Sequence, residues 1–121
     1  ISMILIIDTT KPNLITLALK QKSTIVASLD IDTNRNQSEI LLPEIEKFLK
    51  AQKQKMKDLE AIEVANGEGS FSSLRLGIVT ANALGYAFGI PVRDNSGFVT
   101  KTKGLNVIDP IYNGEPNIGN K

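Results

Sequence analysis

The chain has no cysteine, no histidine and no tryptophan among its 121 residues. Without cysteine it has no disulfide, no thiolate nucleophile and no thiolate ligand for zinc or an iron–sulfur cluster. Without histidine it has no Ser-His-Asp triad, no imidazole metal ligand and no imidazole proton shuttle. Carboxylates, lysine, arginine, hydroxyls and backbone amides remain for chemistry. The composition therefore favours a protein that is not an enzyme by itself.

Aromatic residues and net charge are also low. Aromatics make up 5% of the chain and the formal net charge is +1, which disfavours a base-stacking surface and a bulk attraction to nucleic acid or membrane. No apolar run approaches the roughly 20 residues that span a bilayer. With 41% hydrophobic and 22% charged residues, the composition is that of a globular domain. We expect a cytoplasmic protein with no membrane partner.

Apolar stretches separated by polar turns predict an α/β domain. The expected elements are strands at 3–7, 14–19 and 24–31, a helix from 37 or 38 to about 55, a strand at 59–65, a helix at 71–88 and a strand beginning at 90. Short turns between the first three strands predict an antiparallel meander. Ser38 is the expected N-cap of the first helix, and Gly89 is expected to end the second. Residues 3–94 are expected to form the domain and 95–121 an extended or partly disordered tail.

The segment 71–88 has the pattern of a helix without a polar side, so both of its sides must be buried. One arc carries Leu74, Gly77, Ile78, Ala81, Leu84, Gly85 and Phe88, and the other carries Leu76, Val79, Thr80, Ala83, Tyr86 and Ala87. Either the first helix covers the side that does not face the sheet, or another chain does. We favour an intermolecular helix–helix interface, because a large exposed apolar strip usually marks a contact site.

The loop at residues 66–70 joins a predicted strand to this helix and contains Gly67 and Gly69. Such a turn can hold an anion on free N–H groups, but the P-loop and dinucleotide spacings are not met, and Glu68 would repel phosphate. A tight turn in which Ser70 caps the helix is an equally good interpretation. Asp8, at the end of the first strand, is the best-placed carboxylate for a metal or for proton transfer. Because no second carboxylate stands at an evident spacing, a turn-capping role is favoured for it.

Four segments of the chain stand out together: 3–10, 38–43, 66–77 and 83–92. In this order they resemble the TsaB (YeaZ) family of bacterial proteins in tRNA threonylcarbamoyladenosine (t6A) synthesis. The third contains Gly-Ser-Phe followed by Leu-Arg-x-Gly, and this combination is specific to the family signature. The residues that carry the likeness at the signature positions are Asp8, Glu39, Gly67, Gly69, Ser70, Phe71, Arg75 and Gly77.

The resemblance also has departures. Gln37 stands where the family often has His, while Glu68 and Ser73 replace a Pro and a Gly of the signature. The family usually has a second lobe of similar size, and the chain ends in a segment faintly like the family's C-terminal Pro-x-Tyr. We therefore expect a short form that has only the N-terminal lobe.

The resemblance implies a single lobe of the ASKHA (actin-like ATPase, RNase H-like) fold. Such a lobe has a five-stranded mixed sheet of order 3-2-1-4-5 and two main helices. It further implies a non-catalytic scaffold that binds and supports a TsaD-like transferase, with a TsaE-like ATPase at the junction. ATP or ADP and metal are then expected on the partner proteins, no cofactor on this chain, and contact with tRNA only indirectly. The resemblance also implies that the chain can form a homodimer through the same helices when the partner is missing.

The residues expected at the partner interface are Ile40, Pro43, Leu76, Val79, Thr80, Ala83, Tyr86 and Ala87. Two rival hypotheses remain. One is a minimal nucleotide-binding or ATPase-like lobe that uses Asp8 and the loop Gly67–Ser70. The other is a tRNA-binding module that uses the lysine-rich end of the first helix, although a solvated face is the favoured interpretation of those lysines.

Overall fold

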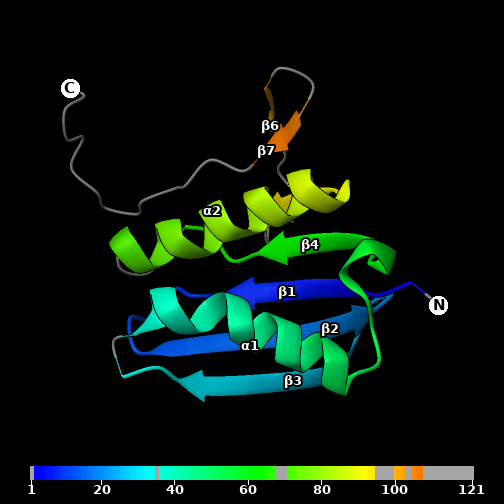
Figure 1. Cartoon of the computed structure of the whole chain (residues 1–121). Helices are drawn as coiled ribbons and strands as arrows, with labels where there is room; N and C mark the ends of the chain where they lie inside the picture. The colour runs from blue at the N-terminus through cyan, green and yellow to red at the C-terminus, as the bar shows by residue number, and fades with distance from the viewer. Residues whose placement is uncertain (1, 35, 68–70, 95–99, 103–104, 108–121) are drawn as a thin grey trace.

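A five-stranded mixed sheet carries two helices on one face in the computed structural model of the chain, which describes residues 2–34, 36–67, 71–94, 100–102 and 105–107 (Figure 1). The elements in chain order are β1 (Ile4–Asp8), β2 (Leu14–Gln21), β3 (Thr24–Asp32), α1 (Gln37–Ala51), the 3-10 turn η1 (Met56–Asp58), β4 (Ala61–Val64), α2 (Phe71–Phe88), β5 (Val92–Asp94), β6 (Thr100–Thr102) and β7 (Leu105–Val107). The sheet order β3-β2-β1-β4-β5 confirms the predicted 3-2-1-4-5 arrangement.

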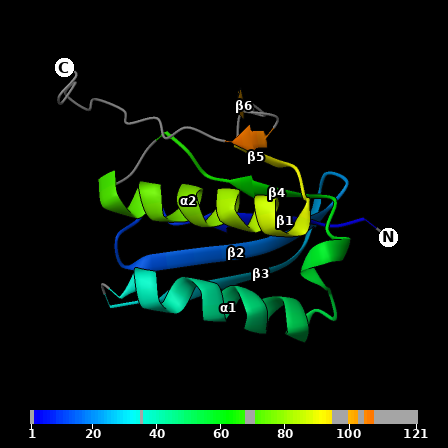
Figure 2. The ribbon, with the colours of Figure 1, turned by 45° about the horizontal axis from the view of Figure 1, so that its top comes forward.

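The first three strands form the predicted antiparallel meander, and β4 and β5 add parallel to β1. Because parallel neighbours need a crossover, α1 and α2 both connect strands across one face of the sheet, where Figure 2 shows them side by side. The core lies between this face and the helices. The side chains of Leu5 and Ile7 on β1 are fully buried there. Ile45 of α1 and Ile78 of α2 are at most 1% exposed.

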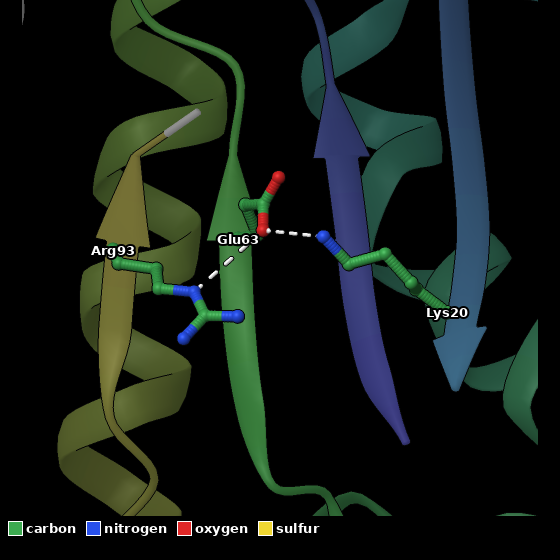
Figure 3. A network of polar contacts seen from close by, with 3 residues as sticks. All are labelled: Lys20, Glu63 and Arg93. Carbon is green, nitrogen blue, oxygen red and sulfur yellow. Dashed lines mark hydrogen bonds and ion pairs between the residues drawn. The ribbon is translucent and has the colours of Figure 1, made fainter. Parts of the chain in front are cut away.

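The opposite face of the sheet carries a network of charged side chains. Glu63, on β4, accepts a hydrogen bond from the Lys20 Nζ at 3.1 Å, and the Nε of Arg93 lies 3.6 Å from the same carboxylate oxygen (Figure 3). The three side chains come from three different strands, and the helices lie behind the sheet in this view. They remain 17% to 36% exposed, so water still screens the network. One face of the sheet is therefore an apolar core and the other is polar at its centre.

Helix α1 ends at Ala51, so the expectation that it reaches about Lys55 is wrong. Lys53 adopts a left-handed conformation (φ 58°). The amides of Lys53 and Gln54 then return to the carbonyls of Lys50 and Leu49, at 3.0 and 2.9 Å. These two bonds form a Schellman motif, which satisfies carbonyls that the helix leaves unpaired. The lysine-rich segment that follows includes η1 instead of further helix.

Helix α1 begins at Gln37, one of the two starts that the sequence left open, but Asn36 rather than the expected Ser38 occupies the N-cap position. The side chain of Gln37 is held against the β1–β2 connection, where it donates to the carbonyls of Lys11 and Leu14 at 2.6 and 3.0 Å. Gln37 is 7% exposed. Sequence patterns predict the helix, and this tertiary contact holds its first residue in place.

Two strands, β4 and β5, begin later in the sequence than predicted. Strand β4 covers Ala61–Val64 instead of 59–65; before it, the Leu59 amide returns to the Met56 carbonyl at 3.1 Å and closes η1. Strand β5 begins at Val92 instead of Ile90, since the Ile90 amide returns to the Gly85 carbonyl at 2.9 Å and caps α2. Gly89 lies between them at φ 68°, as expected for a helix that ends at a glycine.

In the region expected to form the tail, β6 and β7 pair as an antiparallel two-stranded sheet. Strand β7 contacts both α2 and β5. Extended backbone was expected for this region, but this pairing was not. Residues 95–99, 103–104 and 108–121 lie outside the described part of the chain, and the boundary between domain and tail stays a prediction.

Candidate functional site

Helix α2 turns one of its two apolar arcs toward the sheet. Leu74, Ile78 and Ala81 are at most 1% exposed. Gly77 and Gly85 lie on the same arc and face neighbours so close that a Cβ would overlap them: the Thr9 hydroxyl at Gly77, and the Val92 side chain and Ile90 carbonyl at Gly85. The missing side chains therefore let α2 pack directly on β1 and β5. The sequence left open which arc faces the sheet, and this contact decides it.

A hydrogen bond at the first turn of α2 fixes the helix on the sheet. The Thr9 hydroxyl donates to the Ser73 carbonyl at 2.6 Å, and both residues are buried. Thr9 directly follows β1, the central strand of the sheet. The bond therefore joins the C-terminal end of β1 to the first turn of α2, between residues 64 positions apart in the sequence. This bond sets how far α2 is rotated, and hence which side remains outside.

The opposite arc of α2 faces outward. Val79 is 58% exposed and Tyr86 is 72% exposed, while Ala83 and Ala87 are also exposed. Contacts with α1 and β7 cover only part of the helix. The alternative in which α1 covers the whole second side is therefore wrong. We call the set of predicted interface residues the α2 outer surface: half-buried Ile40, Leu76 and Thr80, and exposed Pro43, Val79, Ala83, Tyr86 and Ala87.

An apolar hollow of about 370 Å³ lies between the C-terminal halves of the two helices, next to the α2 outer surface. Its apolar lining comes from both helices and η1: Leu42, Leu49, Met56, Leu84 and Phe88. Leu42 and Phe88 are 46% and 47% exposed. Phe88 belongs to the arc that faces the sheet by helical period, yet it projects at the end of α2 into this hollow. The exposed apolar area thus extends from α2 to α1, and neither Leu42 nor Phe88 was predicted to be part of it.

A second, more polar hollow lies between the N-terminal ends of the two helices. Its lining is Gln37, Ser38, Ser72, Ser73, Arg75, Leu76 and Val79. Arg75 and Ser38 are exposed. The surface between α1 and α2 therefore has a polar hollow at one end and an apolar hollow at the other. A chain bound along both helices would contact both hollows.

Asp8 acts as a turn-capping residue. Its Oδ1 accepts hydrogen bonds from the Thr10 amide at 2.9 Å and the Thr10 hydroxyl at 2.7 Å. Among the residues that the structure describes, no three acidic side chains come together as a metal site would require. The geometry supports the turn-capping interpretation that the sequence favoured.

The structure describes some of the family-signature residues, and others lie outside the described part of the chain. Gly67 adopts φ 116°, a conformation that favours glycine, and Glu39 is exposed in the first turn of α1. Phe71 is the first residue of α2, but Glu68, Gly69 and Ser70 lie outside the described residues, and so does the expected Ser70 cap. Next to this loop, the buried Asn66 amide donates to Asp94 at 3.4 Å. Gln37 and Asn66 are buried polar residues that the sequence patterns did not single out for these contacts.

Within the described ranges no helix is long and apolar enough to cross a membrane. The lysines near the end of α1, at positions 47, 50, 53, 55 and 57, are exposed. Lys47 pairs with Glu44 at 3.3 Å. Their surroundings are those of a solvated face.

Comparison with known proteins shows which family has this sequence and fold. Residues 30–94, more than half of the chain, match the family model of "TsaD: tRNA N6-adenosine threonylcarbamoyltransferase". The *Bacillus subtilis* tRNA threonylcarbamoyladenosine biosynthesis protein TsaB is 32% identical over 89 residues, which are 74% of this chain and 38% of that protein. An uncharacterized protein of *Mycobacterium tuberculosis* is 34% identical over 93 residues, 76% of this chain and 44% of that one.

Solved structures have the same fold. YeaZ from *Pseudomonas aeruginosa* superposes with a TM-score of 0.69 at 24% identity, over 78% of this chain and 43% of that chain. *Thermus thermophilus* RuvC superposes with a TM-score of 0.52 at 13% identity, over 78% of this chain and 64% of that chain. Together with the sheet order, these matches define the chain as a single ASKHA-like lobe. Among proteins with such a lobe, the chain belongs to the TsaB/YeaZ family. It spans less than half the length of the curated relatives it matches.

Proposed function

We propose that this protein is a non-catalytic partner subunit in t6A biosynthesis, and that it binds a TsaD-type transferase through the α2 outer surface. The observation that carries the proposal is the exposed apolar side of α2 in a lobe of the TsaB/YeaZ family. Apolar side chains at this exposure gain free energy when a partner covers them.

The partner is proposed to have the same kind of lobe. The family model that matches residues 30–94 is that of TsaD, so the two proteins would present comparable helices to each other. Small residues at positions 83 and 87 let a second helix approach α2 closely, while Val79 and Tyr86 supply the larger contacts. A TsaE-type ATPase at the junction, an indirect role for tRNA, and nucleotide and metal on the partner proteins complete the proposal.

The test is the substitution Ala83→Glu in the middle of the exposed side. A charge placed in a helix–helix contact must be desolvated without a counter-ion, so binding to the TsaD-type protein of the same host should weaken by about a hundredfold or more. Ala51→Glu is the matched control, because Ala51 is also exposed on a helix but lies on the side of α1 next to β3. Binding is measured by titration calorimetry of purified proteins, with urea unfolding as the check on folding.

Three results would count against the proposal. Unchanged binding of Ala83→Glu would show that the α2 outer surface is not the contact. Tight binding of ATP and Mg²⁺ by the isolated chain would instead favour the alternative, a nucleotide-binding lobe that uses Asp8 and the loop 67–70. A salt-dependent shift of tRNA by the isolated chain would favour the lysine-rich end of α1 as an RNA contact.

A further inference from the structure

Strand β3 is an open edge of the five-stranded sheet. At nine residues it is the longest strand described, and only β2 pairs with it in the described part of the chain. The strand at the opposite edge, β5, contacts β7. Open edge strands present unpaired backbone groups to a further strand, and proteins commonly protect them with lysine, proline or a bulge. Strand β3 contains no lysine and no proline, and its only charged side chains are Asp30 and Asp32 near its end.

The bulge in this pairing leaves most of the strand regular. The register shifts between Leu19 and Lys20, so that Val26 is the extra residue on β3. Pairing from Ala27 to Asp32 then continues without interruption. This six-residue stretch is long enough to accept another strand.

The hydrogen-bond register identifies which backbone groups face outward. The Thr33 amide donates to the Asn13 carbonyl at 2.9 Å, which makes these two residues a hydrogen-bonded pair of the antiparallel ladder. Since such pairs alternate along the strand, Ile31, Leu29 and Ala27 direct their backbone groups toward β2. The amides and carbonyls of Ser28, Asp30 and Asp32 therefore point to the open edge.

Three of the exposed side chains on β3 are large and apolar. Ile25, Val26 and Leu29 are 50%, 47% and 39% exposed. Leu29 borders a hollow between β3 and α1 whose floor includes buried Phe48 and whose rim carries Glu44 and Lys47. This hollow is lined by the side of α1 next to β3 and by no residue of α2.

We propose that β3 pairs antiparallel with β3 of a second copy of this chain, with Leu29 directly opposite Leu29 of that copy. This register joins the outward-facing backbone of Ser28 to that of Asp30 in the other copy, twice by symmetry. On the helix side it places Leu29 against Leu29 and Ala27 against Ile31. On the opposite side it places the Ser28 hydroxyl against the Asp30 carboxylate. Over residues 27–31 each cross-strand pair is apolar with apolar or hydroxyl with acid, and pairs of these kinds stabilise a sheet.

The charges on β3 select this register over its neighbours. A two-fold axis at Asp30 would put two aspartates directly opposite each other, and an axis at Ile31 would put Asp30 opposite Asp32. Like charges in directly opposed positions are destabilising. An axis at Ser28 would pair only residues 27–29 of the regular stretch and would put the bulge residue Val26 opposite Asp30. An axis at Leu29 pairs residues 27–31 of the regular stretch, puts no acid directly opposite another, and brings Val26 opposite Asp32 only at the end of the pairing.

Cysteine cross-linking tests this arrangement directly, because the chain has no cysteine of its own. In the proposed register Leu29 forms a non-hydrogen-bonded pair, with a Cα separation of about 4.5 Å, which is within the range of a disulfide. The variant Leu29→Cys should therefore form a disulfide-linked dimer on mild oxidation, at least about tenfold faster than Lys57→Cys, an exposed position far from the edge, because paired strands raise the local thiol concentration. Equal rates for the two variants would overturn the proposal.

Ser28→Pro is a second variant that acts on the backbone. Proline removes one of the outward-facing N–H groups without removing a bond to β2, and proline is tolerated on edge strands. Light scattering over a range of protein concentrations should show a dimer for the native chain and a monomer for Ser28→Pro, with similar urea unfolding. A native chain that is a monomer at every concentration, or a dimer that persists in a folded Ser28→Pro, contradicts the proposal. A dimer abolished by Ala83→Glu but not by Ser28→Pro would place self-association on α2 instead.

Discussion

Gly85 is the position where the packing of α2 on the sheet can be tested most sharply. A Cβ added there would overlap the Val92 side chain and would lie 2.8 Å from the Ile90 carbonyl oxygen. The second neighbour is backbone, held in place by the bond that ends the helix, so it cannot move aside as a flexible side chain would. Gly85→Ala therefore opposes two effects. Alanine improves helix propensity by about 1 kcal/mol, whereas overpacking a closely packed contact costs about 1–3 kcal/mol.

Because the overlap involves backbone, we expect the packing cost to dominate. Gly85→Ala should lower the free energy of unfolding by about 1–2 kcal/mol, which for a domain of this size corresponds to a fall in Tm of roughly 3–8 °C. The assay is urea unfolding followed by circular dichroism, with an unchanged m value. Ala83→Gly, on the exposed side of the same helix, measures the propensity term alone and should lose about 1 kcal/mol.

The sign of the effect decides the question. If Gly85→Ala is as stable as the native chain or more stable, the gain in helix propensity equals or exceeds the packing cost. In that case α2 does not approach β5 as closely as described. The assignment of the outward arc, and with it the α2 outer surface, would then lose its physical basis.

Two other contacts give predictions that the same unfolding assay checks. Glu63→Gln leaves Lys20 and Arg93 facing each other without an anion, and it should lower the free energy of unfolding by about 1 kcal/mol. The value is modest because all three side chains are partly exposed. The difference from the native chain should shrink in about 1 M salt, which screens exposed charges, and a difference that does not depend on salt would contradict an electrostatic origin. Gln37→Ala removes two hydrogen bonds donated by a buried side chain, and the Lys11 carbonyl keeps its bond from the Leu14 amide, so the substitution should cost about 1–3 kcal/mol. Ser38→Ala, at the neighbouring exposed position, should be nearly neutral. Equal losses for these last two variants would show that the contact to the β1–β2 loop does not hold α1.

Strand and helix patterns alone predicted much of this molecule. Alternation of apolar residues identified the strands of the meander, and the period of 71–88 identified α2 with its correct limits. These features are local, because side-chain direction in a strand or helix follows directly from backbone period. The sheet order came from the resemblance of specific segments to the TsaB/YeaZ family, and the structure confirms it.

Contacts between distant residues decided the rest. Both arcs of α2 are apolar, so its period could not tell which one faces the sheet; Gly77, Gly85 and the Thr9 hydroxyl decide it through packing with β1 and β5. The first residue of α1 is held in place by the Gln37 side chain reaching carbonyls more than 20 residues earlier in the chain.

The chain's lack of cysteine and histidine is a property of the sequence alone, and it limits the chemistry available whatever the fold. Which surfaces remain open to a partner is a property of the tertiary structure. The side of α2 with Val79 and Tyr86 and the outer edge of β3 are exposed only because the other sides of these elements are already packed. A sequence specifies which side chains are apolar, but burial is shared among elements far apart in the chain, so only the folded arrangement shows which apolar side chains are left uncovered.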